Sequence, residues 1–122
     1  MNAERDLIHL FWGGGWASVR VAGSGSMRYP SADILATNKI RILAIECKTC
    51  IKESKYIPQE DIEQLKTFSE MFSAEPWIAI KFKGHEWYFV SLEDLETTNK
   101  SYMINLGLVK SKGLLFEEII SK

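Results

Sequence analysis

Residues 40–48 constrain the fold most, because they form a strongly apolar strand-like run that carries charge at its end. The segment, Ile-Arg-Ile-Leu-Ala-Ile-Glu-Cys-Lys, favours a strand that packs in a protein core, yet Glu46 and Lys48 interrupt it. Alternate residues of a strand share one face of the sheet. We therefore expect the carboxylate of Glu46 and the ammonium of Lys48 to point the same way.

A second acidic residue, Asp33, interrupts the short apolar strand that the sequence predicts over residues 32–36. A tight turn at residues 37–39 would make the two strands antiparallel neighbours and bring Asp33 near Glu46. Two carboxylates in an apolar setting repel each other and lose hydration unless a cation lies between them. Hard oxygen ligands suit Mg²⁺ or Mn²⁺.

A divalent metal at such a site can polarise a phosphodiester, lower the pKa of a bound water and stabilise the charge of the transition state. Lys48 beside it can position the attacking water or neutralise the phosphorus centre. Asp33 followed by Glu-x-Lys therefore indicates a phosphodiester hydrolase. The same residues also fit a plainer interpretation, in which Glu46 and Lys48 form an ordinary ion pair on an edge strand and Asp33 supports a turn.

Local patterns predict the remaining elements. They are a helix over residues 2–12 capped by Asn2, a strand over 16–22, a loop over 23–30, a loop over 49–56, a helix from Pro58 to about Phe72, a hairpin of strands 77–82 and 86–90 joined at Lys83-Gly84, a helical turn over 91–96, a strand over 102–106 and a terminal helix over 114–121.

The bulk composition fits one domain spanning residues 1–122, with 46% hydrophobic and 25% charged residues. The net charge of −1 excludes a polycation, but the charge is unevenly distributed. Residues 1–55 carry 8 Lys and Arg against 5 Asp and Glu, a net of +3, whereas residues 56–122 carry 7 against 11, a net of −4. An anionic partner is therefore expected to meet the first half of the chain.

The two cysteines, Cys47 and Cys50, are too few for a four-cysteine zinc site. A thioredoxin-like redox pair normally opens a helix, whereas Cys47 lies in an apolar strand run, so free thiols in a reducing cytosol are expected. The N-terminus lacks a signal-peptide core and no apolar run reaches membrane-spanning length. We expect a cytoplasmic protein with no membrane partner.

The order and spacing of these residues resemble a known family. Pro-Ser-Ala-Asp33 followed by Ile-Glu46-Cys-Lys48 resembles the PD-(D/E)XK nuclease superfamily. Within it, the chain is most similar to the archaeal Holliday junction resolvases, a match carried by Ala3–Leu7, Val19–Ser24, Ala32–Ala36 and Ala44–Lys48, with Ala79–Phe82 and Trp87–Phe89 also fitting. The resemblance implies an α/β fold with a restriction-endonuclease-like mixed central β-sheet flanked by helices.

The resemblance also implies roles for individual residues. Glu4 would complete a metal site with Asp33 and Glu46, although it also fits a solvated acid in a first helical turn. Lys48 would be the catalytic lysine. Ser24 would supply a hydroxyl needed for cleavage, although its Gly-Ser-Gly-Ser setting equally fits a flexible linker. The resemblance also assigns Arg5 to a place near the scissile phosphate and Arg20 to the DNA backbone. Arg28, Lys52 and Lys55 are expected DNA contacts for a different reason, as the positive charges in the loops near the predicted site.

A four-way junction has two equivalent strands to cut, so two active sites in a C2 homodimer would suit it. The resemblance places the dimer interface on the central helix, at Leu65, Phe68 and Phe72; alternatively, a monomer buries all three.

The function implied is a structure-selective endonuclease that resolves four-way junctions by paired nicking in recombination and repair. It would depend on Mg²⁺, for which Mn²⁺ substitutes, and on no organic cofactor. Two alternatives stay open: a restriction- or repair-type endonuclease that cuts linear duplex, and a non-catalytic DNA-binding dimer of the same fold.

Overall fold

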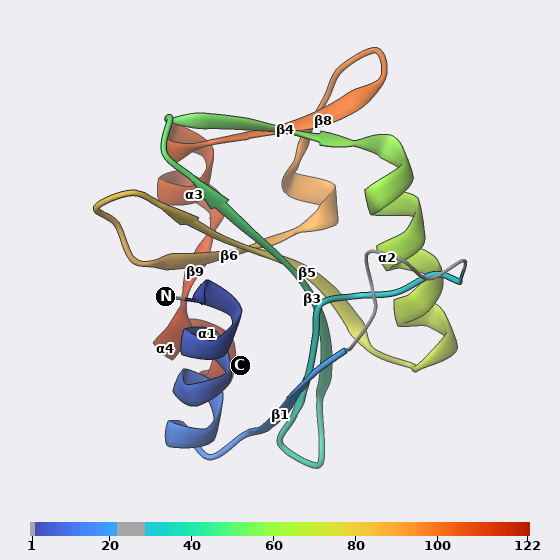
Figure 1. Cartoon of the computed structure of the whole chain (residues 1–122), viewed down its shortest axis with the longest axis vertical. Helices are drawn as coiled ribbons and strands as arrows, with labels where there is room; N and C mark the ends of the chain where they lie inside the picture. The colour runs from blue at the N-terminus through green and yellow to red at the C-terminus, as the bar shows by residue number, and fades with distance from the viewer. Residues whose placement is uncertain (1, 22–28) are drawn as a thin grey trace.

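A mixed six-stranded sheet is the centre of the computed structural model, which describes residues 2–21 and 29–122 (Figure 1). Its strand order is β1-β2-β3-β5-β6-β9. Strands β3 and β5 are parallel, and the other neighbours are antiparallel. The strands are β1 (Ala17–Arg20), β2 (Ile34–Thr37), β3 (Ile42–Cys50), β5 (Glu75–Phe82), β6 (Trp87–Ser91) and β9 (Leu114–Leu115).

A smaller sheet of three strands, in the order β4-β8-β7, continues from the end of β3. Its members in the described part of the chain are β4 (Ser54–Pro58), β7 (Glu96–Thr97) and β8 (Ser101–Asn105). The expectation of a loop over residues 49–56 is therefore wrong. β4 pairs with β8, whose residues lie more than forty positions further along the chain, and this distant partner leaves no local signal.

The helices largely follow the sequence patterns. The Asn2 side chain caps α1 by accepting hydrogen bonds from the backbone N–H groups of Glu4 and Arg5, at 2.9 and 3.3 Å. The pattern missed α3, which Asn105 caps by accepting from the N–H of Leu108 at 2.7 Å. Within the described ranges the helices are α1 (Ala3–Gly13), α2 (Gln59–Met71), α3 (Leu106–Lys112), α4 (Phe116–Ser121) and the 3₁₀ turn η1 (Leu92–Asp94).

None of these helices combines the length and apolar character needed to span a bilayer.

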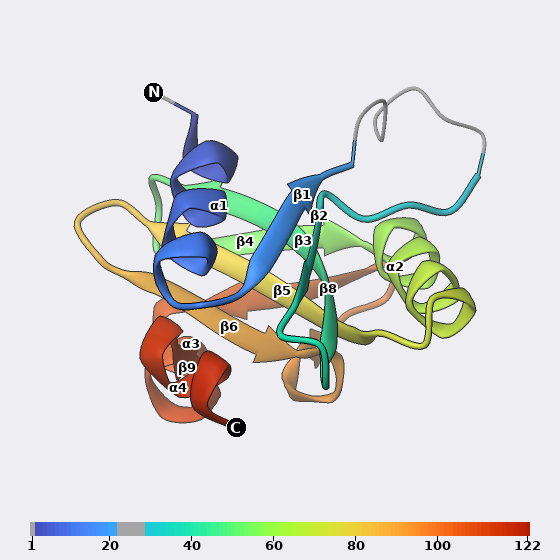
Figure 2. The ribbon, with the colours of Figure 1, turned by 90° about the horizontal axis from the view of Figure 1, so that it is seen from below.

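The main sheet separates two apolar clusters, one on each face. Figure 2 shows α1 and α2 on opposite sides of β1, β2 and β3. Leu43 and Ile45 of β3 pack toward α1 and α4, in the cluster that holds Leu7, Phe11 and Ile119. Ala44 of β3 packs on the opposite face, in the cluster that holds the buried side of α2 and residues of the smaller sheet. Alternate residues of β3 therefore serve different layers, as expected for a central strand covered on both faces.

Candidate active site

Asp33 lies just before the first residue of β2, close enough to Glu46 for the two carboxylates to interact. The β2–β3 register ends at the pair of Ile34 and Ile45. The backbone N–H of Asp33 donates to the carbonyl of Ile45 at 2.9 Å. The Asp33 carboxylate then accepts a hydrogen bond from the N–H of Cys47 through Oδ2, at 2.8 Å. Backbone pairing and this side-chain bond together fix the orientation of the carboxylate.

Glu46 and Lys48 share one face of β3, as their spacing predicts. Lys48 Nζ lies 3.5 Å from Glu46 Oε2, and both side chains are only 19% exposed. They follow Ala44, whose side chain packs in the cluster beneath α2, so the pair lies on the α2 side of the sheet. Glu46 and Lys48 do form an ion pair, but with both side chains only 19% exposed it is not an ordinary surface pair.

Asp61 joins this pair from α2 and was not among the residues singled out by sequence. Its Oδ2 lies 3.5 Å from Lys48 Nζ, so the ammonium lies between two carboxylates. In the sequence, Asp61 is only an acid in the first turn of a predicted helix. An acid is common there because the helix dipole stabilises it, so its position did not indicate an active-site contact. Only the packing of α2 on β3 reveals the contact with Lys48.

Burial and neighbouring charge shift the titration of the site. Burial, and then the negative charge of Asp33, raise the pKa of Glu46 to about 7, although Lys48 opposes this. Burial also raises the pKa of the Cys47 thiol, followed by the charges of Asp33, Glu4 and Glu46. The thiol therefore stays protonated and is a poor nucleophile. Both Cys47 and Cys50 are free, as expected.

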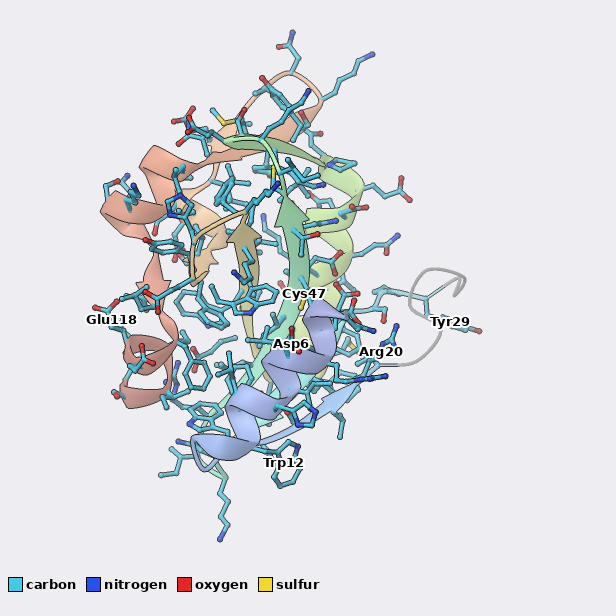
Figure 3. All side chains as sticks on the ribbon, turned by 60° about the vertical axis from the view of Figure 1, so that its left-hand side comes forward. Asp6, Trp12, Arg20, Tyr29, Cys47 and Glu118 are labelled. Carbon is cyan, nitrogen blue, oxygen red and sulfur yellow. The ribbon has the colours of Figure 1, made fainter. Side chains whose placement is uncertain are left out.

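Glu4 approaches the site from α1, where it forms an ion pair. Its Oε1 lies 2.9 Å from Nε of Arg20, whose side chain is 60% exposed. Figure 3 shows Arg20 and Cys47 close to the N-terminal part of α1. Over residues 2–21 and 29–122, no three His, Cys, Asp or Glu side chains are grouped closely enough to hold a metal ion together. Glu4 as a third metal ligand therefore stays a prediction.

The donor chemistry of Asp33 and Glu46 fits a magnesium site of the usual protein type. Mg²⁺ keeps several waters and is commonly held by one or two carboxylates together with substrate phosphates. The nearby charge of Asp33 raises the pKa of Glu46, and a divalent cation would offset this cost of ionising Glu46. These two carboxylates could hold the metal, and the neighbouring ammonium of Lys48 is placed to contact a phosphate.

The residues predicted to contact DNA lie in two places, on α1 and β1 and at the turn between β3 and β4. Arg5 is exposed on α1 and Arg20 on β1. Lys52 and Lys55 line a hollow of about 440 Å³ at the turn between β3 and β4, with Tyr56 beside them. Arg28 and Ser24 lie outside the described residues.

The predicted interface residues on α2 differ in exposure. Leu65 is 0% and Phe68 8% exposed, whereas Phe72 is 50% exposed. The expectation for Leu65 is corrected, because a side chain buried within its own chain has no surface for a partner. Phe72 instead lines an almost wholly apolar groove of about 230 Å³ with Val19, Leu35 and Ile42.

Comparisons with known proteins agree with this geometry. The sequence model of a family described as "Archaeal holliday junction resolvase (hjc)" matches residues 1–122. The crossover junction endodeoxyribonuclease Hjc of Archaeoglobus fulgidus is 39% identical over 119 residues, covering 98% of this chain and 87% of that protein. The enzyme of the same name from Methanocaldococcus jannaschii is 40% identical over 119 residues, covering 98% of this chain and 84% of that protein.

Similarity extends to a solved structure. The 1.6 Å structure of Archaeoglobus fulgidus Hjc, a Holliday junction resolvase from an archaeal hyperthermophile, superimposes with a TM-score of 0.91 at 37% identity. The match covers 97% of this chain and 95% of that chain. The expected restriction-endonuclease-like α/β fold is therefore confirmed.

Proposed function

The chain belongs to the archaeal Holliday junction resolvase family, and from this premise we propose that it is a cytoplasmic crossover junction endodeoxyribonuclease that nicks four-way DNA junctions. The observation that carries the proposal is the closeness of the Asp33 and Glu46 carboxylates, with Lys48 Nζ 3.5 Å from Glu46 on the same face of β3. This arrangement brings together two carboxylates that can bind a metal and one ammonium, from β3 and from the residue just before β2.

The proposed cofactor is Mg²⁺, held by Asp33 and Glu46 with Glu4 as a further ligand. When bound, the metal would supply Lewis-acid activation of the phosphodiester and a more acidic water. The protein's own groups act around it. The Cys47 N–H holds the Asp33 carboxylate in place, while Lys48 offers positive charge to the phosphate that gains charge during cleavage.

Arg20 engages only Oε1 of Glu4, so Glu4 would serve as a ligand through its second oxygen or after the ion pair opens. A DNA phosphate is a suitable replacement partner for Arg20, whose side chain is largely exposed. Contacts by Arg5, Lys52 and Lys55 would then bind backbone phosphates, so that recognition depends on junction shape rather than on base edges.

We propose a homodimer that uses the groove around Phe72. Exposed apolar side chains line the groove, with Val19 57%, Phe72 50% and Ile42 38% exposed. A second copy of the same surface, related by a twofold axis, would cover them. The two active sites would then face the two strands that a paired cut requires.

The decisive experiment incubates the protein with an immobile four-way junction and with a linear duplex of matched sequence, in Mg²⁺, Mn²⁺ or EDTA. We expect paired nicks in the junction with either metal and none in EDTA. Asp33→Asn should reduce nicking by at least about 10³-fold and leave junction affinity within about twofold, because it removes one metal-binding charge but no phosphate contact.

Each alternative has its own outcome in this experiment. Equal cleavage of junction and linear duplex would identify a duplex endonuclease. Binding without any nick, in either metal, would show a non-catalytic member of the family and overturn the proposal.

A further inference from the structure

Lys48 is held by carboxylates from two different elements. Glu46 is its same-face neighbour on β3, and Asp61 reaches it from the first turn of α2, each with an oxygen 3.5 Å from Nζ. A lysine side chain has four rotatable bonds and so orders poorly on its own. An anionic partner on each side restricts where this ammonium can lie.

Asp61 differs from the acid immediately before it. Glu60 is exposed, and its Oε1 accepts a hydrogen bond at 3.5 Å from the side-chain amide of Gln64, on the same helix. Asp61 instead precedes Ile62, which is fully buried where α2 packs against the sheet, and its carboxylate is 37% exposed. Both acids favour the positive end of the helix, but only Asp61 contacts the site.

The arrangement has a physical consequence for phosphate binding. If Glu46 were the only anion near Lys48, the ammonium could rotate about that carboxylate through many positions. Asp61 attracts it from the α2 side with the same separation. The ammonium then stays between strand and helix, where a phosphate oxygen can reach its remaining hydrogens.

We propose that Asp61 is a positioning residue for the proposed nuclease reaction, which acts through Lys48 and contacts neither metal nor DNA. This inference rests on the proposed function for its effect on cleavage. It assigns α2 a second role beside packing, because the first turn of the helix determines where the catalytic ammonium lies.

The test compares Asp61→Asn with the matched variant Glu60→Gln, which removes a charge from the same helical turn without touching Lys48. Single-turnover nicking of pre-bound junction should fall about 10- to 100-fold in Asp61→Asn, the range expected for a misplaced catalytic group. Glu60→Gln should stay within about twofold of the wild type. Asp61→Glu should recover part of the rate, and junction affinity and melting temperature should be unchanged in all three.

A second readout needs no substrate. The side-chain ¹⁵N signal of Lys48 should change in Asp61→Asn and stay unchanged in Glu60→Gln. An unaltered Lys48 signal, an unaltered rate, or equal losses in both variants would overturn the proposal. A wild-type protein that nicks no DNA would instead overturn the nuclease function, while the Lys48 signal would still decide whether Asp61 positions the ammonium.

Discussion

Glu46 is an acid whose surroundings favour its neutral form, and this has a measurable effect on stability. Its pKa is about 7 in the folded protein against an ordinary value of 4.5, so the folded state binds a proton there that the unfolded chain releases. Stability is therefore lost as the pH rises from 4.5 to 7, and the loss is complete above that range.

Replacing this carboxylate should stabilise the metal-free protein. In EDTA at pH 8, Glu46→Gln should raise the free energy of unfolding by on the order of 2 kcal/mol, as the raised pKa implies. The gain should shrink toward zero as the pH falls to 4.5. Urea denaturation across this range measures it, with Glu60→Gln as the exposed-acid control. A gain that is the same at every pH would contradict the assigned cause.

At the scale of elements, the turn between β3 and β4 forms a hollow lined by basic side chains. It follows directly after the strand that carries Glu46 and Lys48. Lys52 and Lys55 line it only a few residues beyond Lys48. If each contacts a phosphate, Lys52→Gln and Lys55→Gln should each reduce the slope of log affinity against log salt by about 0.9. Fluorescence anisotropy with a labelled junction measures this slope.

Lys110 is exposed on α3, so Lys110→Gln is the control for simple loss of positive charge. An equal reduction in slope for Lys110→Gln, or weaker binding at unchanged slope in the other two variants, would contradict a contact at the hollow.

The elements that sequence predicted correctly are those whose signals are local. Asn2 at the start of α1, and Gly84 with a φ of 82° in the β5–β6 turn, are position-specific signals that the structure confirms. β4 was missed because its pairing partner, β8, is distant in sequence. α3 is a short helix between strands, and its seven residues carry too little periodicity for a helix to be predicted there.

The candidate site shows the same difference between contacts that local sequence patterns predict and contacts that depend on distant packing. The alternation of residues along β3 correctly placed Glu46 beside Lys48, and the turn after β2 correctly brought Asp33 near Glu46. Asp61 could not be found in this way, because its contact depends on how α2 packs across the sheet. The ion pair between Glu4 and Arg20 was likewise not predicted, because each residue was expected in a separate role.

At the scale of the whole molecule, the groove around Phe72 predicts how two chains associate. Phe72→Ala should weaken the dimer about tenfold or more, as expected for an aromatic side chain at an interface centre. It should also convert paired nicks into single nicks, because each site would then act alone. Sedimentation equilibrium measures the association. Leu10→Ala, which shortens a 41% exposed side chain on α1, is the control and should leave association unchanged.

A wild-type protein that sediments as one chain at all concentrations would contradict the dimer itself. Equal weakening by Leu10→Ala would contradict the placement of the interface.

The hydrogen bond between the Cys47 N–H and the Asp33 carboxylate provides an internal probe of the active site. β3 lies inside the sheet, so its amides should exchange with solvent only when the molecule opens extensively. The Cys47 amide is different, because its acceptor is a side chain rather than another strand. Its deuterium uptake relative to the other β3 amides would therefore report how long the Asp33 carboxylate remains in position, in a protein to which nothing is bound.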